Sequence, residues 1–246
     1  MREYRTDLHI HTLLSACAEV EMIPPLIVDE ALHKGLDIIA ITDHNTTRNA
    51  AAVMQAAAGS GLTVLPGMEL QTQEEVEIIC LFDSLARAEM WEEQVETWLP
   101  PLENDPERFG PQYIVDAEGD FVAEDTQMRQ LPAEIGLETA ARAARELGGL
   151  VFPAHIERPA KGLMVILGLW PPDLAADAAE VSFNMRPSEA RATYPHLPDI
   201  PIITNSDAHW LNWIGKVLTV FVMQRPSIDE MRKALRGEGE RRVYVP

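Results

Sequence analysis

Short apolar runs alternate with amphipathic segments along almost the whole chain. The apolar runs have the length and the β-branched content of buried strands. They predict strands at 6–10, 37–42, 62–68, 76–82, 150–153, 179–183, 201–205 and 217–223. The amphipathic segments predict helices at about 24–34, 46–58, 85–99 and 136–147, and a last helix that begins at the capping box of residues 227–230. Strands joined by helical crossovers pair in parallel, so the pattern predicts an α/β fold with a parallel barrel or sheet.

The region from about residue 84 to 135 breaks this alternation. It begins with the amphipathic helix at 85–99, which Pro100 and Pro101 end. Two short apolar stretches then flank Ala117-Glu118-Gly119, and this pattern predicts a β-hairpin. We interpret the region as an insertion into the barrel. Two roles remain open for it: a cap that shapes substrate choice, or a lobe that covers the side of the barrel.

Metal-ligand side chains follow the first apolar run and three later ones, at the point where each run ends. The segments are Asp7-Leu8-His9-Ile10-His11, Thr42-Asp43-His44, Pro153-Ala154-His155 and Ser206-Asp207-Ala208-His209. Alternate residues of a strand point to the same face, so His9 and His11 project together. Because the carboxyl ends of parallel strands meet at one edge, we expect all four segments to converge. Imidazoles beside carboxylates suit divalent cations, so the sequence predicts one multi-metal site built from the whole chain.

These motifs resemble, in order and in residue type, those of the polymerase and histidinol phosphatase (PHP) superfamily. The resemblance runs from residue 7 to residue 209 and includes Gly67-Met68-Glu69 between the second and third segments. It implies a single PHP-type domain over residues 1–246, folded as a distorted (β/α)7 barrel with its metal site at the C-terminal strand ends. It also implies a phosphoesterase that uses two to three divalent metal ions, with Mn, Zn and Fe all open.

The resemblance also assigns roles to individual residues. The first metal is expected on His9, His11, Glu69 and Asp207. Glu69 is expected to bridge to a second metal that His155 also binds, while His44 and His209 hold a third. Asp7 and Asp43 are expected to orient neighbouring histidines through hydrogen bonds.

Two positions depart from the family pattern. Many relatives carry Asp or His shortly after the first motif, where this chain has Cys17 and Glu19, and the spacing does not decide between them. A thiolate would favour a zinc-like ion and a carboxylate a harder one. Many relatives also carry a histidine in the strand after Glu69, where this chain has Glu77. A charged residue inside an apolar strand is rarely there for packing, so we expect Glu77 to be functional.

Arg158 follows His155 by three residues, as a basic residue does in nucleotide-phosphatase relatives. Its guanidinium group is suited to binding phosphate oxygens in a bidentate way. We therefore expect three catalytic residues, Glu69, Asp207 and Arg158, with Arg158 as the phosphate-binding group. A salt bridge on a loop is the alternative for Arg158.

Charge and cysteine content limit the partners and the cellular compartment that we expect. The formal net charge of −19 favours a small phosphorylated substrate over long nucleic acid, because binding to long nucleic acid needs a basic surface. Two cysteines give no disulfide framework, which is typical of the cytoplasm. No basic segment followed by an apolar run opens the chain, and no apolar stretch reaches the roughly 20 residues that span a bilayer, so neither a signal peptide nor a membrane partner is expected.

The expected function is hydrolysis of a phosphate ester on a small phosphorylated metabolite or nucleotide by a metal-activated water. One alternative is a phosphodiesterase or exonuclease that acts on short oligonucleotides. A second is a non-catalytic metal-binding module, which the near-complete ligand set argues against. The oligomeric state is left open by the sequence.

Overall fold

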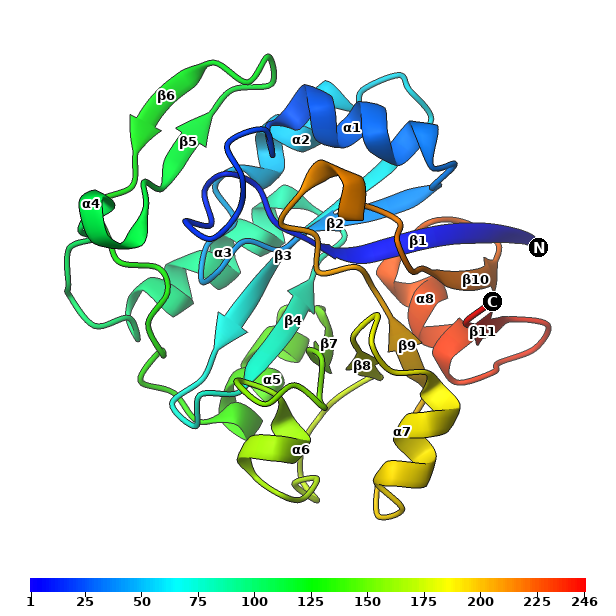
Figure 1. Ribbon diagram of the computed structural model, residues 1–246. Helices are drawn as coiled ribbons and strands as arrows, with labels where there is room; N and C mark the ends of the chain where they lie inside the picture. The colour runs from blue at the N-terminus through cyan, green and yellow to red at the C-terminus, as the bar shows by residue number, and fades with distance from the viewer.

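A curled sheet of seven strands forms the centre of the molecule (Figure 1). The computed structural model describes residues 1–246. The strands follow the order β11 (Arg242–Tyr244), β10 (Thr219–Met223), β1 (Arg2–Ile10), β2 (Ile38–Ile41), β3 (Thr63–Gln71), β4 (Glu77–Leu81) and β7 (Leu150–Pro153). A parallel pair, β8 (Ala179–Val181) and β9 (Ile202–Thr204), lies apart from this sheet. The prediction of an α/β fold with a barrel-like sheet is confirmed at this level.

Backbone hydrogen bonds join the pair β8 and β9 to the main sheet at two places. Ile156, just after β7, donates its backbone N–H to Glu180 O of β8 at 2.9 Å. On the other side, His11 N donates to Ala208 O at 3.0 Å, which joins the segment after β9 to the end of β1. The sheet and the pair therefore surround one interior, as in a distorted barrel.

The prediction of parallel strands throughout is wrong for part of the sheet. Only β1, β2 and β3 pair in parallel within it, whereas β4 is antiparallel to both β3 and β7, and β10 is antiparallel to β1 and β11. The reason is the short connection between β3 and β4. Five residues can close a hairpin, but a parallel crossover needs a dozen or more.

This reversal places the start of β4 at the edge where β2 and β3 end. Glu77, the first residue of β4, pairs with Gln71, the last residue of β3. β7 reverses again, so its last residue, Pro153, pairs with Ile78. The predicted site therefore lies at the C-terminal ends of β1, β2, β3 and β7 and at the N-terminal end of β4.

Helices cover the outside of the sheet in two groups (Figure 1). α1 (Pro24–His33) and α2 (Ala50–Ala56) pack on β2 and β3 in one apolar cluster, and α3 (Leu85–Glu96) and α5 (Leu137–Glu146) share another with β3, β4 and β7. α8 (Ile228–Leu235) packs beside β10. The remaining helical segments are short: α4 (Pro106–Phe109), α6 (Leu163–Ile166), α7 (Pro187–Thr193) and the 3-10 helix η1 (Leu211–Trp213). No helix combines the length and the apolar character that crossing a membrane would require.

α2 begins later than the sequence predicts, at Ala50 instead of Thr46. The polar side chains before it make contacts that a helix would prevent. Thr46 Oγ1 and Thr47 Oγ1 both donate to the carboxylate of Glu92 on α3. Side chains of this kind compete with the helix for hydrogen bonds, so the segment after β2 is a fixed loop.

The region 84–135 divides into a helix that is part of the outer layer and a hairpin at the rim. Trp91 and Val95 of α3 are buried in the main apolar cluster. The expected hairpin forms from β5 (Tyr113–Val115) and β6 (Phe121–Glu124) and lies beside α1 and α2 in Figure 1. Asn49 fixes it, because its side chain bonds to Tyr113 O and to the backbone N–H of Val115. The single-domain assignment of residues 1–246 stays a prediction.

Candidate metal centre

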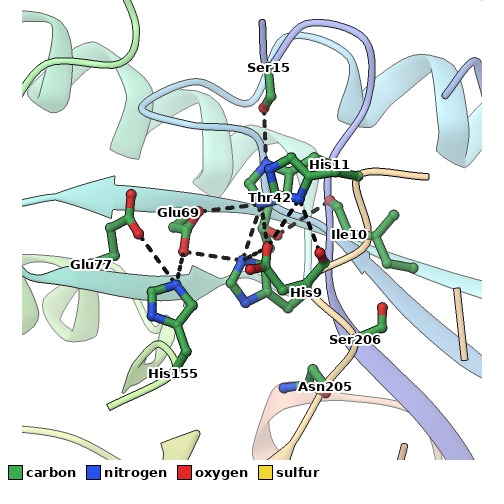
Figure 2. Close-up of polar contacts among 12 residues, drawn as sticks. His9, Ile10, His11, Ser15, Thr42, Glu69, Glu77, His155, Asn205 and Ser206 are labelled. Atoms are coloured by element: carbon green, nitrogen blue, oxygen red, sulfur yellow. Dashed lines mark hydrogen bonds and ion pairs between the residues drawn. The ribbon is translucent and has the colours of Figure 1, made fainter. Parts of the chain in front are cut away.

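The structure brings the residues expected as metal ligands together at one edge of the sheet (Figure 2). Seven of them and Glu77 form what we call the strand-edge cluster: His9, His11, His44, Glu69, Glu77, His155, Asp207 and His209. All are buried except His209, which is partly exposed. Their roles as ligands stay a prediction, and the geometry gives the grouping.

Four residues converge at the first group, and they are the four expected for the first metal: His9, His11, Glu69 and Asp207. His9 Nε2 lies 3.1 Å from Glu69 Oε1 and 3.2 Å from Asp207 Oδ1. His9 Nε2 and His11 Nε2 are also 3.2 Å apart. Two imidazole nitrogens and two carboxylate oxygens that face one point form the donor set of a divalent cation site.

Glu77 joins a second group with His44, Glu69 and His155. Figure 2 shows the contacts of His155 with Glu69 and Glu77. His155 Nε2 lies 3.2 Å from Glu69 Oε1 and 3.3 Å from Glu77 Oε2. His44 Nδ1 lies 3.1 Å from Glu69 Oε2 and 3.6 Å from Glu77 Oε1. Glu69 therefore takes part in both groups, as a bridging carboxylate would.

The third group consists of His11, His44 and His209. Cys17 and Glu19, which the sequence leaves undecided, differ here. Cys17 Sγ lies 3.1 Å from His209 Nε2, whereas the Glu19 carboxylate accepts a hydrogen bond from Trp210 Nε1 at 2.9 Å. Of the two, only Cys17 lines the cavity of the site.

A hydroxyl relay holds His11 in place. Its Nδ1 contacts Ser15 Oγ at 3.0 Å, and that hydroxyl donates to Asp43 at 2.7 Å. Asp43 therefore orients a histidine as expected, but through Ser15. The expectation for Asp7 is wrong. Its carboxylate accepts from the N–H and hydroxyl of Ser206 and from Gly215 N, so it fixes the loop before Asp207 and not a histidine ring.

Glu180 is a residue of the site that the sequence did not indicate. It is fully buried on β8, and its Oε1 lies 3.1 Å from His9 Nδ1. It also accepts from His155 N and Asn205 Nδ2. A carboxylate on Nδ1 fixes the tautomer that leaves Nε2 free for a cation. The available signal was the same as for Glu77: an acidic residue inside an apolar strand.

Backbone conformation is unusual at this edge of the sheet. Five residues other than glycine have positive φ, and four of them surround the cluster: Asn45 (52°), His155 (28°), Lys161 (67°) and Asp207 (50°). Such conformations each cost of order 1 kcal/mol or more and persist where the surrounding structure demands them. Their position at the strand ends indicates that this edge is shaped for function.

The charged groups of the cluster depend on one another. Burial alone lowers the pKa of His9, but the neighbouring carboxylates, with Glu69 foremost, hold that pKa well above its usual value. Burial likewise lowers the pKa of His155, and Glu69 and Glu77 raise it to about 9. Conversely, burial raises the pKa of Glu69 and the histidines hold it well below its usual value. Protons on histidines thus supply the positive charge that a divalent cation would bring instead.

The thiol of Cys17 belongs to the same electrostatic system. Loss of solvent raises its pKa, but His44 and His209 outweigh this effect and lower the pKa to about 5. Cys17 is an exposed residue, so the contact with two imidazoles decides the direction. A thiolate at neutral pH is the form of cysteine that binds metal.

The donor set fits divalent cations. Asp207 Oδ1 is buried and forms no hydrogen bond, although the Nε2 atoms of His9 and His11 lie 3.2 Å from it. Folded proteins leave few buried polar atoms unpaired, and a bound cation is one way in which such atoms are satisfied. Together with the converging imidazoles and carboxylates, this oxygen supports metal binding by the residues present.

A cavity of about 610 Å³ opens onto the cluster. Two positively charged side chains line it beside the expected ligands. Arg158 Nη1 lies 2.5 Å from Asp207 Oδ2, and Lys161 Nζ lies 2.5 Å from Glu77 Oε1. Gln130 is the one residue of the region 84–135 that lines it.

Comparison with known proteins gives matches over much of the chain. The sequence pattern of the PHP domain matches residues 7–148, and that of the PHP-associated region matches residues 194–238. The chain is 22% identical to the uncharacterized protein YqxK of Bacillus subtilis over 277 aligned positions, covering 100% of this chain and 65% of that protein. It thus spans just under two thirds of this relative's length.

Solved structures share the fold. The lesion-specific endonuclease Q of Pyrococcus furiosus superposes with a TM-score of 0.73 at 21% identity, over 98% of this chain and 58% of that one. Endonuclease Q in complex with a 27-mer duplex substrate, with an abasic lesion at the active site, gives 0.75 at 20% identity over the same shares. A protein of Bifidobacterium adolescentis, assigned as a metal-dependent phosphoesterase, gives 0.52 at 20% identity, over 83% and 87%. Identities this low show the fold alone.

The expectation that long nucleic acid is excluded as a partner is wrong. An enzyme that acts on duplex DNA shares the fold over 98% of this chain. Net charge is a sum over the whole surface and does not report the local field, which Arg158 and Lys161 make less negative at the cavity. The family and the two kinds of structure support a hydrolase that acts on phosphate esters. With the PHP pattern matched over residues 7–148 of 246, this chain belongs to the PHP domain family.

Proposed function

We propose that this chain hydrolyses phosphodiester bonds in nucleic-acid strands with the help of two to three divalent cations. The observation that carries the proposal is the strand-edge cluster itself, which gathers imidazoles and carboxylates beneath an open cavity. The shared fold with endonuclease Q supports a phosphodiester as substrate. Composition favours a small phosphorylated metabolite, but that substrate now has less support than the phosphodiester alternative.

The ligand groups suggest which residues hold each cation. The first would be held by His9, His11, Glu69 and Asp207. The second would be held by Glu69, Glu77 and His155, and His44 lies close to the carboxylates of Glu69 and Glu77. A third would lie among His44, His209 and Cys17. When bound, such cations lower the pKa of a water molecule and neutralise charge on phosphate oxygens.

The protein's own residues would do three further things. Glu180 would keep His9 in the tautomer with Nε2 free, and Ser15 would fix the ring of His11 from its Nδ1 side. Arg158 would leave Asp207 for the non-bridging oxygens of the substrate, to which its planar group can make two hydrogen bonds. Lys161 would supply a second positive charge at the cavity.

The test is a cleavage assay with the metal-loaded chain. End-labelled duplexes with and without an abasic site, a single strand of the same sequence, and p-nitrophenyl phosphate would be offered in parallel. We expect cleavage of at least one oligonucleotide, and no cleavage by Glu69→Gln. Turnover of p-nitrophenyl phosphate with every oligonucleotide intact would overturn the phosphodiester proposal in favour of a small ester.

A further inference from the structure

We propose that Trp210 and Trp213, with Phe183 and Lys216 beside them, form a stacking platform for a nucleobase next to the cleaved phosphodiester. The inference deepens the proposed function and rests on it for the identity of the ligand. We define the aromatic platform as these four residues. They come from the loop after β8 and from the segment around η1.

The aromatic rings are already arranged around one another. The ring centroids of Trp210 and Trp213 are 4.4 Å apart, and those of Trp213 and Phe183 are 5.3 Å apart with a nearly perpendicular arrangement. Trp213 also packs against the apolar cluster beneath α1 and α2. The inner rings are thus anchored in the fold, and Trp210 extends from them.

Trp210 is exposed although it is held in one orientation. It keeps 39% of its surface accessible, so part of the large indole is open to solvent. Its Nε1–H donates to Glu19 Oε1 at 2.9 Å, which fixes the indole. A fixed, exposed aromatic face loses little entropy when a flat ligand stacks on it. The same contact explains why Glu19 takes no part in the third ligand group.

The platform begins where the strand-edge cluster ends. The ring of His209 lies 4.2 Å from that of His11, and the ring of Trp210 lies 6.1 Å from that of His209. A base is separated from its own phosphate by a single sugar. A phosphate held at the cluster would therefore bring a neighbouring base within reach of Trp210.

Lys216 adds a cation to the aromatic platform. Its Nζ lies 3.7 Å from the centroid of Phe183 and 4.7 Å from that of Trp213. It is exposed and forms no ion pair, in a chain with 39 acidic and 20 basic residues. Aromatic faces interleaved with a free cation are the means by which proteins hold single strands, with bases stacked and phosphates paired. A small metabolite without a base would gain nothing from this arrangement.

The experiment compares the wild type with variants in their affinity for a labelled, short, single-stranded oligonucleotide. Phosphorothioate linkages protect the oligonucleotide from cleavage, and fluorescence anisotropy measures binding. Stacking is worth about 1–3 kcal/mol per base, so Trp210→Ala should weaken binding by roughly 5- to 150-fold. Trp210→Phe should retain most of the affinity. Phe121→Ala, on the exposed β6, is the matched control and should change nothing. Lys216→Ala should lower the slope of log affinity against log salt by about 1.

A second set of ligands tests the contact itself. Removing one base at a time from the oligonucleotide should identify a position where the loss weakens wild-type binding but leaves Trp210→Ala unaffected. Equal losses in both proteins at every position, or a change below about twofold in Trp210→Ala, would overturn the aromatic platform. Platform-dependent binding without cleavage of any oligonucleotide would refute the proposed function alone, and cleavage that does not depend on Trp210 would refute the platform alone.

Discussion

Two clusters of charged side chains, one at the strand edge and one beside the loop after β2, are satisfied in different ways. The strand-edge cluster gathers imidazoles and carboxylates that neutralise one another only when the histidines hold protons. We call the other cluster the Arg129 network: Arg48, Glu92, Glu96, Asp125 and Arg129. There two guanidinium groups face three carboxylates, and hydroxyl and amide donors from the loop after His44 complete the set.

The difference distinguishes structure from function. In the Arg129 network the guanidinium of Arg129 lies 2.7 Å from both Asp125 and Glu96, and arginine keeps its charge at any ordinary pH. In the strand-edge cluster Glu69 is paired with imidazoles alone, and imidazoles can give up their protons. A cluster whose carboxylates are paired with permanently charged arginines fixes the fold. In a cluster whose carboxylates are paired with protonated histidines, a divalent cation can replace the protons.

The largest effect on stability is expected from breaking the Arg129 network. Arg129→Met leaves Asp125 and Glu96 with the exposed Arg48 as their remaining partner, so the free energy of unfolding should fall by about 1.5–3 kcal/mol. Added Mn²⁺ should not restore it. Urea unfolding measures this, with the exposed Arg142→Met as control. A loss below about 1 kcal/mol would mean that the network is not what holds the region 84–135 to the loop after β2.

The corresponding change in the strand-edge cluster should spare the fold and remove activity. Glu69→Gln keeps the shape but removes one of the two carboxylate charges in each of the two ligand groups. We expect a loss of roughly 10²-fold or more in kcat, with unchanged circular dichroism. Steady-state kinetics on the cleaved substrate measures it, and the exposed Glu146→Gln is the control. An active Glu69→Gln enzyme would show that the bridging role is assigned to the wrong carboxylate.

Arg158 tests whether phosphate recognition is separate from metal binding. Arg158→Ala should leave metal stoichiometry unchanged and lower kcat/KM by about 10- to 150-fold, the value of a charge-assisted contact of ~1.5–3 kcal/mol. Arg158→Lys should recover part of the loss because it keeps the charge but not the planar group. If the kinetics of the Ala variant match the wild type, Arg158 only pairs with Asp207, and Lys161 becomes the candidate.

The smallest effect concerns an ion pair near neither cluster. Hydrogen bonds from Arg241 and from the backbone of Gln224 lower the pKa of Glu230 from 4.5 to about 2. A carboxyl group whose pKa is lower in the folded than in the unfolded state stabilises the fold at a pH above the unfolded-state pKa. This stabilisation is lost as the pH falls through the folded-state pKa. The stability gap between wild type and Glu230→Gln should therefore be constant from pH 7 to about 5 and close towards pH 2. A gap that widens on acidification would contradict this.

Much of the site could be predicted from the sequence because strand periodicity and strand ends are local properties. The shared face of His9 and His11 and the meeting of four strand ends followed from them. The direction of β4 depended on a connection too short for a crossover, and with it came the place of Glu77. The partner of Asp7 and the role of Glu180 depended on side chains far away in sequence, which no local pattern specifies. The proton-dependent balance of the cluster is a property of the assembled fold.

The central claim is that the strand-edge cluster holds divalent cations and that the Arg129 network does not need them. Its most direct test is elemental analysis after the chain has been stripped with chelator, reloaded with Mn²⁺ or Zn²⁺ and dialysed, with wild type and Glu69→Gln treated alike. We predict two to three ions per wild-type chain and at least one fewer in the variant. Fewer than one ion bound per wild-type chain would contradict the account.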